Sequence, residues 1–554
     1  MKRAIVCVLM CGLALGAMYA GGRSQSSSGG GGVYSTIEVT RLNIPEEPWL
    51  VPYNTPVVMT TVNSPYVDNK FSLPTDNESN NLWTRAYKKY LNIELQTLWV
   101  SNEYDTNLNL AIASGEIPDV FKVNDTQFRQ LMEAGMLEDI TDAVTGNVST
   151  KVKAYYDFVP SILDAYRKNG RLYGFPQMYY GDIEIPHYMW FRKDWAAALG
   201  FNGDPKTVDE LVRRMEAVNQ RYGAKGIAVD KGISELYAIA PMWHAAPNIW
   251  VTGRDGTIVY GTVQPEMKTA IAAFADWYKR GLINPNFAIE DGDTVKTDVI
   301  NGKYGVQPFA QWWGWYAGEG VVNNNGPQSY FEPYLLPSID NNPVLYPLNF
   351  PNYGTIVVRK GYQHADAVMK LFNMYVFIEM DGKKYKVFSD VDLTEFNTNE
   401  HTMPFIIRAP TIDYNGYIQT QDFKKNGDIS VFDSQSHADD AVLSKRYDES
   451  GSTGMESISN VFGRYLQMYN GRSSYGLAKG IVDRDEFIRN KIWGATPEGV
   501  AKYGSTLSDM LLEGFTQIIL GNQPIGHFDT LVRNWYAQGG QEMTDAVNAM
   551  YGGK

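Results

Sequence analysis

Cysteine is almost absent from this chain, and its two cysteines lie close to the start. Cys7 and Cys11 are the only cysteines among 554 residues, and they fall within an apolar run, 4–20, that follows two basic residues. A basic start, a short apolar run and the small residues Ala20-Gly21-Gly22 are typical of a cleaved export signal. We therefore expect 1–20 to be a signal peptide. Its removal would leave a mature chain in which disulfides and cysteine metal sites are excluded.

Two alternatives concern how the chain is held outside the cell. The apolar run could stay as a membrane anchor, and Cys11 could carry lipid, although the residue before it, Met10, is bulky. No other stretch is long and apolar enough to span a bilayer. Residues 21–34 contain the Gly/Ser tract RSQSSSGGGG, which favours a flexible tether. We expect an exported protein, periplasmic or at the cell surface, with membrane tethering left open.

Basic residues are fewer than acidic ones. The chain has 49 Lys and Arg and 62 Asp and Glu, so its formal net charge is -13. Nucleic-acid binding depends on basic surface that releases counterions, so nucleic acid is excluded as a partner. A highly anionic polysaccharide is also disfavoured as the main ligand. That second exclusion is weaker, since a local basic pocket can overrule the global charge.

Recognisable catalytic motifs are missing. The chain has no H-E-x-x-H, no phosphate-binding G-x-x-x-x-G-K-[ST] and no G-x-S-x-G, and its six histidines are dispersed. Gly318-Glu319-Gly320 fails the dinucleotide fingerprint at its last position. We expect no enzyme, no cofactor and no metal. A glycosidase needs only two carboxylates, so a secreted carbohydrate-active hydrolase is an alternative.

One segment has the spacing of a calcium loop. Residues 422–433 place an acid first, Gly427 sixth and Asp433 twelfth. Lys424 occupies the third position, where a carboxylate ligand belongs, and it would bring a cation beside the ion. A plain polar turn is the favoured interpretation, and a bound calcium ion is the alternative.

Helical and strand-like segments alternate along the chain, and its length calls for two or more domains. The strand 118–123 leads directly into a helix that begins at Asn124, which is the repeating unit of a parallel α/β sheet. Thr207 and Glu210 have the spacing of a capping box. These patterns predict a doubly wound α/β architecture, with helices over 82–91, 108–113, 124–135, 207–218, 265–281 and 506–521.

Several stretches in order along the chain resemble the family of extracellular solute-binding proteins that serve ATP-driven sugar importers. The resemblance is closest to its longer, lipoprotein-type members associated with oligosaccharide uptake. The stretches are ASGEIPDVF at 113–121, LMEAGMLEDIT at 131–141, GFP at 174–176, MWFRKDW at 189–195, ALGF at 198–201, TVDEL at 207–211, GLINP at 281–285, NGKYG at 301–305, MPFIIR at 403–408, FTQIILG at 515–521 and GGQEMTDAVN at 539–548.

The resemblance implies a two-lobed periplasmic-binding-protein fold of type 2, with the ligand in a cleft between the lobes. We expect lobe 1 to comprise 35–165 and about 296–365, and lobe 2 to comprise 166–295 and about 366–554. The resemblance also implies that the protein carries a carbohydrate, an oligosaccharide above all, to an ABC permease in the membrane without chemical change. We expect the protein to be a monomer. A surface sensor or adhesin with the same fold is a further alternative. Long relatives often carry a calcium loop after the 207 helix, but 219–226 here lacks any carboxylate.

A tryptophan cluster supplies the leading candidates for the ligand site, since sugar rings stack on aromatic platforms. Trp312, Trp313 and Trp315 follow the expected strand 305–309. The resemblance places a stacking tryptophan where Trp312 stands. If the strand continued, Trp313 and Trp315 would share one face and Trp312 the other, unless Gly314 broke the alternation. Packing in the core is the alternative for all three.

Further candidates lie near the ends of expected strands or in the stretch where the family crosses between lobes. Others lie in an aromatic stretch that ends at Trp250, or in a loop that the family places near the opening. For Asn124 and Asp125 helix capping is the alternative role, and for His244 it is a structural hydrogen bond. The further ligand-binding candidates are Asn124, Asp125, Tyr179, Tyr180, Asp182, Trp243, His244, Asn63, Tyr66, Asn352, Tyr353 and Trp493.

Overall fold

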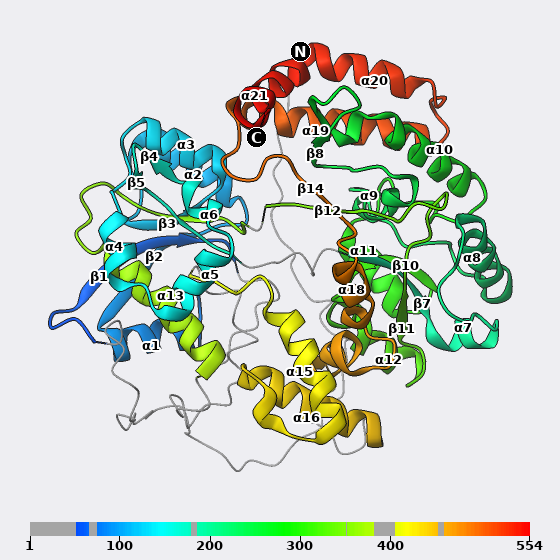
Figure 1. The fold of residues 1–554 in the computed structure, drawn as a ribbon, viewed down its shortest axis with the longest axis horizontal. Coiled ribbons are helices and arrows are strands. Elements are labelled where there is room, and N and C mark those ends of the chain that lie inside the picture. The colour runs from blue at the N-terminus through cyan, green and yellow to red at the C-terminus, as the bar shows by residue number, and fades with distance from the viewer. Residues whose placement is uncertain are drawn as a thin grey trace, which may run out of the picture.

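Buried apolar side chains form two large clusters, which define two lobes. The structure is a computed structural model that describes residues 51–65, 75–178, 186–350, 352–381, 405–451 and 459–553. One cluster joins 57–178 to 356–407, and the other joins 188–348 to 423–547. We call them the first and the second lobe, and Figure 1 shows them side by side. No helix in the described ranges has both the length and the apolar composition of a membrane span.

In the first lobe, helices cover small sheets. Strands β1 and β2 pair in parallel, whereas β13 lies between β3 and β6 and is antiparallel to both. The elements of this lobe are β1 (Val57–Asn63), α1 (Leu82–Leu91), β2 (Ile93–Val100), α2 (Tyr104–Ser114), β3 (Val120–Val123), α3 (Asp125–Glu133), α4 (Thr141–Asn147), α5 (Thr150–Phe158), α6 (Ser161–Asp164), β4 (Arg167–Lys168), β5 (Arg171–Leu172), β6 (Phe175–Pro176), β13 (Thr355–Val358) and α13 (Ala365–Asp381).

The second lobe is built around β7, which is the central strand of a three-stranded sheet with β10 and β11. Its elements before the first lobe resumes are β7 (His187–Arg192), α7 (Lys193–Ala198), α8 (Val208–Tyr222), α9 (Ser234–Ile239), η4 (Ala240–Trp243), β8 (Trp250–Thr252), β9 (Ile258–Tyr260), η5 (Gly261–Val263), α10 (Pro265–Lys279), α11 (Gly292–Ile300), β10 (Val306–Ala310), η6 (Gly314–Gly318), α12 (Glu319–Asn325), β11 (Phe331–Tyr334) and β12 (Tyr346–Leu348).

The C-terminal part of the chain completes the second lobe with helices, and β14 pairs in parallel with β12. The long helix α19 packs against α10, α20 and α21 (Figure 1). These elements are α15 (Ile412–Asn426), η8 (Ile429–Val431), α16 (Gln435–Ser450), α17 (Ser459–Arg464), η9 (Tyr465–Tyr469), α18 (Ser474–Asp483), β14 (Phe487–Arg489), α19 (Glu498–Ile519), α20 (His527–Trp535), η10 (Tyr536–Gly540) and α21 (Gln541–Tyr551).

The sheets are mixed rather than parallel throughout, and the strands that follow the crossings of the chain are antiparallel to their neighbours. Strand β7 is the first strand after the chain enters the second lobe, and it is antiparallel to β10 and β11. Strand β13 is the first strand after the chain returns, and it is antiparallel to β3 and β6. Each lobe therefore has a sheet in which the strand that follows a crossing is antiparallel to both of its neighbours.

The cluster membership revises the expected division of the chain. The segment 296–365 was expected in lobe 1, but its buried side chains from Val299 to Leu348 pack in the second cluster. Of the described buried side chains in that segment, only Ile356, Val357 and Val358 belong to the first cluster, because β13 pairs with β3 there. The buried part of α13 also belongs to the first cluster, whereas 366 onward was expected in lobe 2.

Most helices form where their capping residues predicted them. Asn124 caps α3 by accepting from the Gln127 backbone N–H, and Gly115 ends α2 with a left-handed φ of 77°. Thr207 caps α8, although its partner Glu210 accepts from the Lys206 N–H rather than closing a capping box. The helix expected over 506–521 begins eight residues earlier, at Glu498, directly after Pro497. Proline fits at such a start because the first N–H groups of a helix need no intrahelical acceptor.

Candidate functional site

The tryptophan cluster lies on a helical turn rather than on a strand. Strand β10 ends at Ala310, and the backbone N–H groups of Trp315 and Tyr316 donate to the Trp312 carbonyl at 3.0 and 3.3 Å. Residues three and four apart share one face of a helix. Trp312 and Trp315 are accordingly 43% and 39% exposed, whereas Trp313 is fully buried. The expectation that Trp313 and Trp315 share a face was wrong, because the strand ends before them.

Trp313 is a core residue of the second lobe. Its ring stacks on Trp190 at a centroid distance of 5.7 Å and packs against Phe331 at 4.5 Å. Its indole N–H donates to the Gln307 side chain at 2.9 Å, which satisfies its only polar group. The Trp313 side chain therefore anchors the turn to the core, and it is not accessible to a ligand.

Trp312 and its neighbours form an open aromatic surface beside a crossing of the chain. Trp312 packs edge-on against Phe309 at 4.6 Å and against Tyr316 at 5.9 Å. The preceding Ala310 pairs with His187, the first residue of β7, which follows the passage from the first lobe. The turn thus lies at the edge of the sheet where the chain passes between lobes.

Trp315 is oriented by polar side chains from the end of α17 and from η9. Its indole N–H donates to the Gln467 side chain at 3.0 Å, and Gln467 donates in turn to Gln311 at 3.2 Å. The Arg464 guanidinium lies 5.7 Å from the centroid of the Trp315 ring. The Trp315 indole lies directly against Gly463. A Cβ added to Gly463 would lie only 2.3 Å from the ring, so the contact has no room for a side chain at this position.

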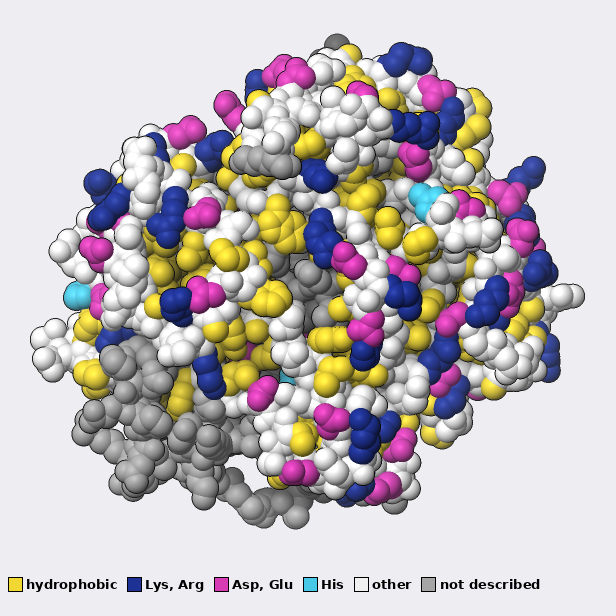
Figure 2. Space-filling model, viewed as in Figure 1, with side chains coloured by type: hydrophobic (Ala, Val, Ile, Leu, Met, Phe, Trp, Pro, Cys, Tyr) yellow, Lys and Arg dark blue, Asp and Glu magenta, His cyan; other side chains and the backbone are white. Residues whose placement is uncertain are grey.

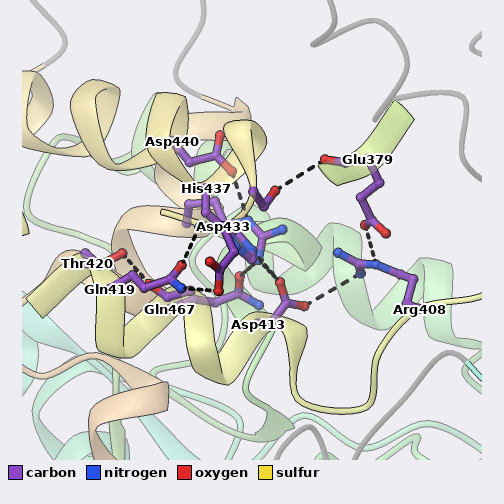
Figure 3. A network of polar contacts seen from close by, with 12 residues as sticks. Glu379, Arg408, Asp413, Gln419, Thr420, Asp433, His437, Asp440 and Gln467 are labelled. Atoms are coloured by element: carbon purple, nitrogen blue, oxygen red, sulfur yellow. Dashed lines mark hydrogen bonds and ion pairs between the residues drawn. The ribbon is translucent and has the colours of Figure 1, made fainter. Parts of the chain in front are cut away.

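A buried network of charges continues from Arg464 toward the first lobe (Figure 3). Asp413 of α15 accepts from Arg464 at 2.9 Å and from His437 of α16 at 2.9 Å. Its second oxygen lies 3.6 Å from Arg408, which donates to Glu379 of α13 at 2.6 Å. This network therefore connects the turn that carries Trp315 with a helix of the first lobe.

The pKa of Asp413 follows from its partners. Burial alone would raise the pKa of this carboxyl, but the Arg464 and Arg408 guanidinium groups, followed by His437, hold it well below its ordinary value. Burial likewise acts to lower the pKa of Arg464, and the carboxylates of Asp413 and Asp440 overcome it and raise that pKa. Both partners are therefore charged at neutral pH, and each compensates the desolvation of the other.

The carboxyl group of Glu235 acts on the aromatic turn, by which we mean the turn 312–316 that carries Trp312, Trp313 and Trp315. Burial, followed by the neighbouring carboxylate of Asp230, raises the pKa of Glu235 to about 7. Glu235 in turn acts on Tyr316, whose pKa is raised first by burial and then by this carboxylate. A carboxyl group that titrates near neutral pH can donate or accept a hydrogen bond, as a hydroxyl-rich ligand requires.

A second group of candidates meets at the start of α3. Asp125 accepts from the Tyr166 hydroxyl at 3.1 Å, and the Asn352 side chain donates to that same hydroxyl at 2.5 Å. The other carboxylate oxygen of Asp125 accepts from Thr496 at 2.5 Å. Because Thr496 lies between β14 and α19, this hydrogen bond joins the two lobes.

Three segments that pass between the lobes are hydrogen-bonded to one another at Gln177. Its backbone N–H donates to Gly354 at 2.8 Å, its carbonyl accepts from Tyr353 at 2.8 Å, and its side chain donates to Ile406 at 3.2 Å. Gln177 is buried, and the next residue accepts from the Arg408 N–H at 2.7 Å. The crossing segments are thereby held together at one place, where a rotation between lobes would be absorbed.

The remaining candidates contact other side chains of the protein or lie outside the described residues. Trp243 is buried against Phe274 and Trp277, and His244 contacts Asp340 at 3.0 Å. Asn63 ends β1 and donates to Thr97 at 3.3 Å. Trp493 packs edge-on against Phe350 at 5.6 Å, beside the crossing segment. The candidates outside the described residues are Tyr66, Tyr179, Tyr180 and Asp182.

The segment with calcium-loop spacing is largely helical. Residues 422–426 are the last turn of α15, and only Gly427 adopts a left-handed conformation, with a φ of 72°. Lys424 donates to the Tyr469 carbonyl at 2.6 Å, and Asp433 accepts from Gln419 at 2.7 Å. Across the described residues, no three His, Cys, Asp or Glu side chains are grouped so that they could hold a metal ion.

The surface between the lobes is hollowed, and hydrophobic side chains line both walls of the hollow (Figure 2). The sequence did not single out several polar residues that organise this region, namely Lys122, Gln177, Gln311, Arg464, Gln467 and Thr496. Only Lys122 carried a local signal, since it is a lone charge inside the apolar strand Val120–Val123. The others interact with partners far away in sequence.

Comparisons with known proteins agree with this architecture. The chain is 23% identical over 488 residues to the lipoprotein LipO of Bacillus subtilis, a match that covers 84% of this chain and 88% of LipO. The structure of the alginate-binding protein AlgQ2 superposes with a TM-score of 0.62 at 14% identity, over 90% of this chain and 98% of that protein. An HMO-binding, ABC-transporter-associated solute-binding protein of Bifidobacterium longum infantis gives 0.60 at 14% identity, over 90% and 99%.

These solved structures share the two-lobed fold of type 2 periplasmic binding proteins, so the fold expected from the sequence is confirmed. The family model of bacterial extracellular solute-binding proteins matches residues 75–377, which is more than half of the chain. With two lobes, a hollow between them and this match, the chain belongs to the family of bacterial extracellular solute-binding proteins.

Proposed function

We propose that this protein captures an oligosaccharide in the cleft between its lobes and delivers it, chemically unchanged, to the membrane permease of an ABC importer. The observation that carries the proposal is the exposed pair Trp312 and Trp315 at the edge of the second-lobe sheet. Aromatic platforms with a few polar groups nearby are what sugar rings require. The proteins with similar folds support it, since they are described as alginate-binding and HMO-binding.

The polar groups around the platform suit a ligand rich in hydroxyl groups. The Trp315 indole donates to Gln467, Gln467 donates in turn to Gln311, and the carboxyl of Glu235 acts electrostatically on Tyr316. Each of these side chains can accept a hydrogen bond, and the two amides can also donate. No bond needs to be broken for such a site to work, so we propose that the protein is not an enzyme. As a member of an extracellular family it would act outside the cytoplasmic membrane.

A thermal-shift screen against oligosaccharides of varied linkage tests the proposal, because a ligand that binds only the folded state raises the melting temperature. The sugar that stabilises the protein should then be recovered intact after long incubation, as chromatography would show. Cleavage of the sugar would point to a hydrolase instead. Absence of any stabilising sugar across a broad panel would contradict the proposal.

Trp312→Ala should weaken binding of that sugar by about 1–3 kcal/mol, as for the loss of an aromatic anchor in a binding site. The stability without ligand should change less, since the side chain is 43% exposed and makes two edge-on ring contacts. Calorimetric titration and urea unfolding of the mutant measure the two effects separately.

Trp195→Ala is the matched control for this variant. Trp195 of α7 stacks on Tyr222 of α8 at a centroid distance of 4.2 Å. Figure 1 shows these two helices on the side of the second lobe away from the first lobe, so the loss of Trp195 should leave affinity unchanged. Equal affinity of Trp312→Ala and the unmodified protein would remove Trp312 from the site.

A further inference from the structure

Lys122 is an unusual residue in its strand. Strand β3 reads Val120–Val123, and every other residue in it is buried and apolar. The Lys122 side chain passes over Gly354. A Cβ added to Gly354 would lie only 2.2 Å from the Lys122 Cε. Gly354 also has a φ of 140°, which favours glycine on its own account. The backbone of the crossing segment is therefore shaped so that this lysine can reach past it.

The ammonium group of Lys122 ends beside an exposed aromatic ring. Its Nζ lies 3.7 Å from the centroid of the Tyr353 ring, and Tyr353 is 41% exposed. Tyr353 belongs to the segment that joins β12 of the second lobe to β13 of the first. The charge and the ring thus lie together where the chain crosses between the lobes.

In the part of the chain that the structure describes, no carboxylate pairs with this charge. Among the described residues, Lys122 makes no ion pair and its Nζ makes no hydrogen bond, although an ammonium offers three donors. Asp105 of α2 is the charged group that acts on it, and that carboxylate accepts from Asn124 at 3.3 Å and from Gln127 at 3.1 Å. Burial lowers the pKa of Lys122 to about 8, and Asp105 opposes that shift.

A half-buried ammonium without a counter-ion is costly, so such groups gather at functional sites. An anionic group of a ligand could offset this cost in full, because it would supply both charge and acceptors. The ring of Tyr353 could stack on the sugar that carries the anion. The net charge of -13 makes the approach of a polyanion unfavourable, which favours a short ligand with few charges.

We propose that Lys122 binds the carboxylate of an acidic sugar residue, placed beside the Tyr353 ring, so that the preferred ligands are acidic oligosaccharides. This inference rests on the proposed function and specifies its class of ligand. It concerns the first-lobe side of the cleft, whereas the tryptophan platform lies on the second lobe. The ligand would then be held from both lobes, by a charge on one side and by aromatic rings on the other.

The test compares oligogalacturonides with their methyl esters, which keep the shape of the sugar and lose its charge, and with neutral and sulfated oligosaccharides. At pH 7 the unmodified protein should bind the acid form at least about tenfold more tightly than the ester, as for a charge-assisted contact. Lys122→Met should remove this preference and change affinity for the ester by less than about threefold. Lys279→Met, on the outer helix α10, is the control and should keep the preference.

A pH series gives a second readout that does not depend on the Met variant. Affinity of the unmodified protein for the acid form should fall between about pH 7 and 9.5, because the lysine loses its proton in that range. Lys122→Arg should bind at pH 7 and show no such fall, since a guanidinium stays charged. If Lys122→Met does not fold, this comparison carries the test.

Equal affinity of the unmodified protein for acid and ester would overturn the inference and leave the proposed function intact. A preference for sulfated over uronic ligands would overturn the assignment to a carboxylate. Absence of binding to every sugar in the panel would overturn the proposed function as well as the inference. Retention of the acid preference in folded Lys122→Met would show that another group binds the anion.

Discussion

Replacing Asp413 by asparagine is expected to lower the free energy of unfolding by about 3–5 kcal/mol at neutral pH, as for a buried ion pair that loses one partner. The change keeps the shape of the side chain and removes its charge. Arg464 then loses the carboxylate at 2.9 Å, and Arg408 loses the one at 3.6 Å. Both guanidinium groups stay charged, so the free-energy cost of burying them is offset less than in the unmodified protein.

The effect should depend on pH with a definite sign. The folded protein holds the pKa of Asp413 well below its ordinary value, whereas the unfolded chain restores a value near 4. The carboxylate therefore contributes its full stabilisation above about pH 4, and this contribution is lost as the pH falls toward the folded pKa. Urea unfolding at pH 7 and at about pH 3, which lies below the unfolded pKa, should show a smaller difference between the two proteins at the lower pH.

Asp157→Asn is the matched control. Asp157 pairs with Lys153 on the surface, where both side chains are more than half exposed, so its loss should cost less than about 1 kcal/mol. Equal stabilities of Asp413→Asn and the unmodified protein would mean that the network in Figure 3 is not formed as described.

Trp313→Ala is expected to have a comparably large effect on folding, about 3–5 kcal/mol, as for other buried aromatic residues replaced by alanine. The side chain is fully buried, stacks on Trp190 and Phe331, and donates to Gln307. Its removal leaves a cavity beneath the aromatic turn and an amide oxygen without its donor. Both consequences act on the folded state.

Sugar affinity distinguishes the roles of the neighbouring tryptophans. At a temperature where Trp313→Ala remains folded, its affinity should be reduced less than that of Trp312→Ala, because Trp313 presents no surface to a ligand. Calorimetric titration of the two variants side by side measures this. A stable Trp313→Ala with abolished binding would reverse the assignment of the two residues.

Local signals predicted the elements that position the site. Helix α1 begins and ends where the periodic apolar residues of 82–91 indicated, and Asn124 and Thr207 cap the helices that they precede. Such features depend on residues a few positions apart, so the sequence carries them directly. Strand β10 lies one residue later than the expected strand 305–309, and the face assignment of the tryptophans was wrong because a helical turn begins at Trp312.

Long-range contacts could not be predicted in this way. Asp413 meets residues 24 and 51 positions away, and Asp125 meets Thr496 across 371 positions. Nothing near Gln177 indicates that three crossing segments join there. The division of the chain between lobes differs from the expected one for the same reason, since β3, one of the two partners of β13, lies more than 200 residues earlier.

Small-angle scattering of the protein with and without a saturating oligosaccharide tests the central claim most directly. If the ligand is enclosed between two lobes that rotate about the crossing segments at Gln177, the radius of gyration should fall on binding while the mass stays that of one chain. The sugar from the stabilisation screen, acid or neutral, is the ligand for this measurement. Superimposable profiles at proven saturation would contradict capture by closure of the lobes.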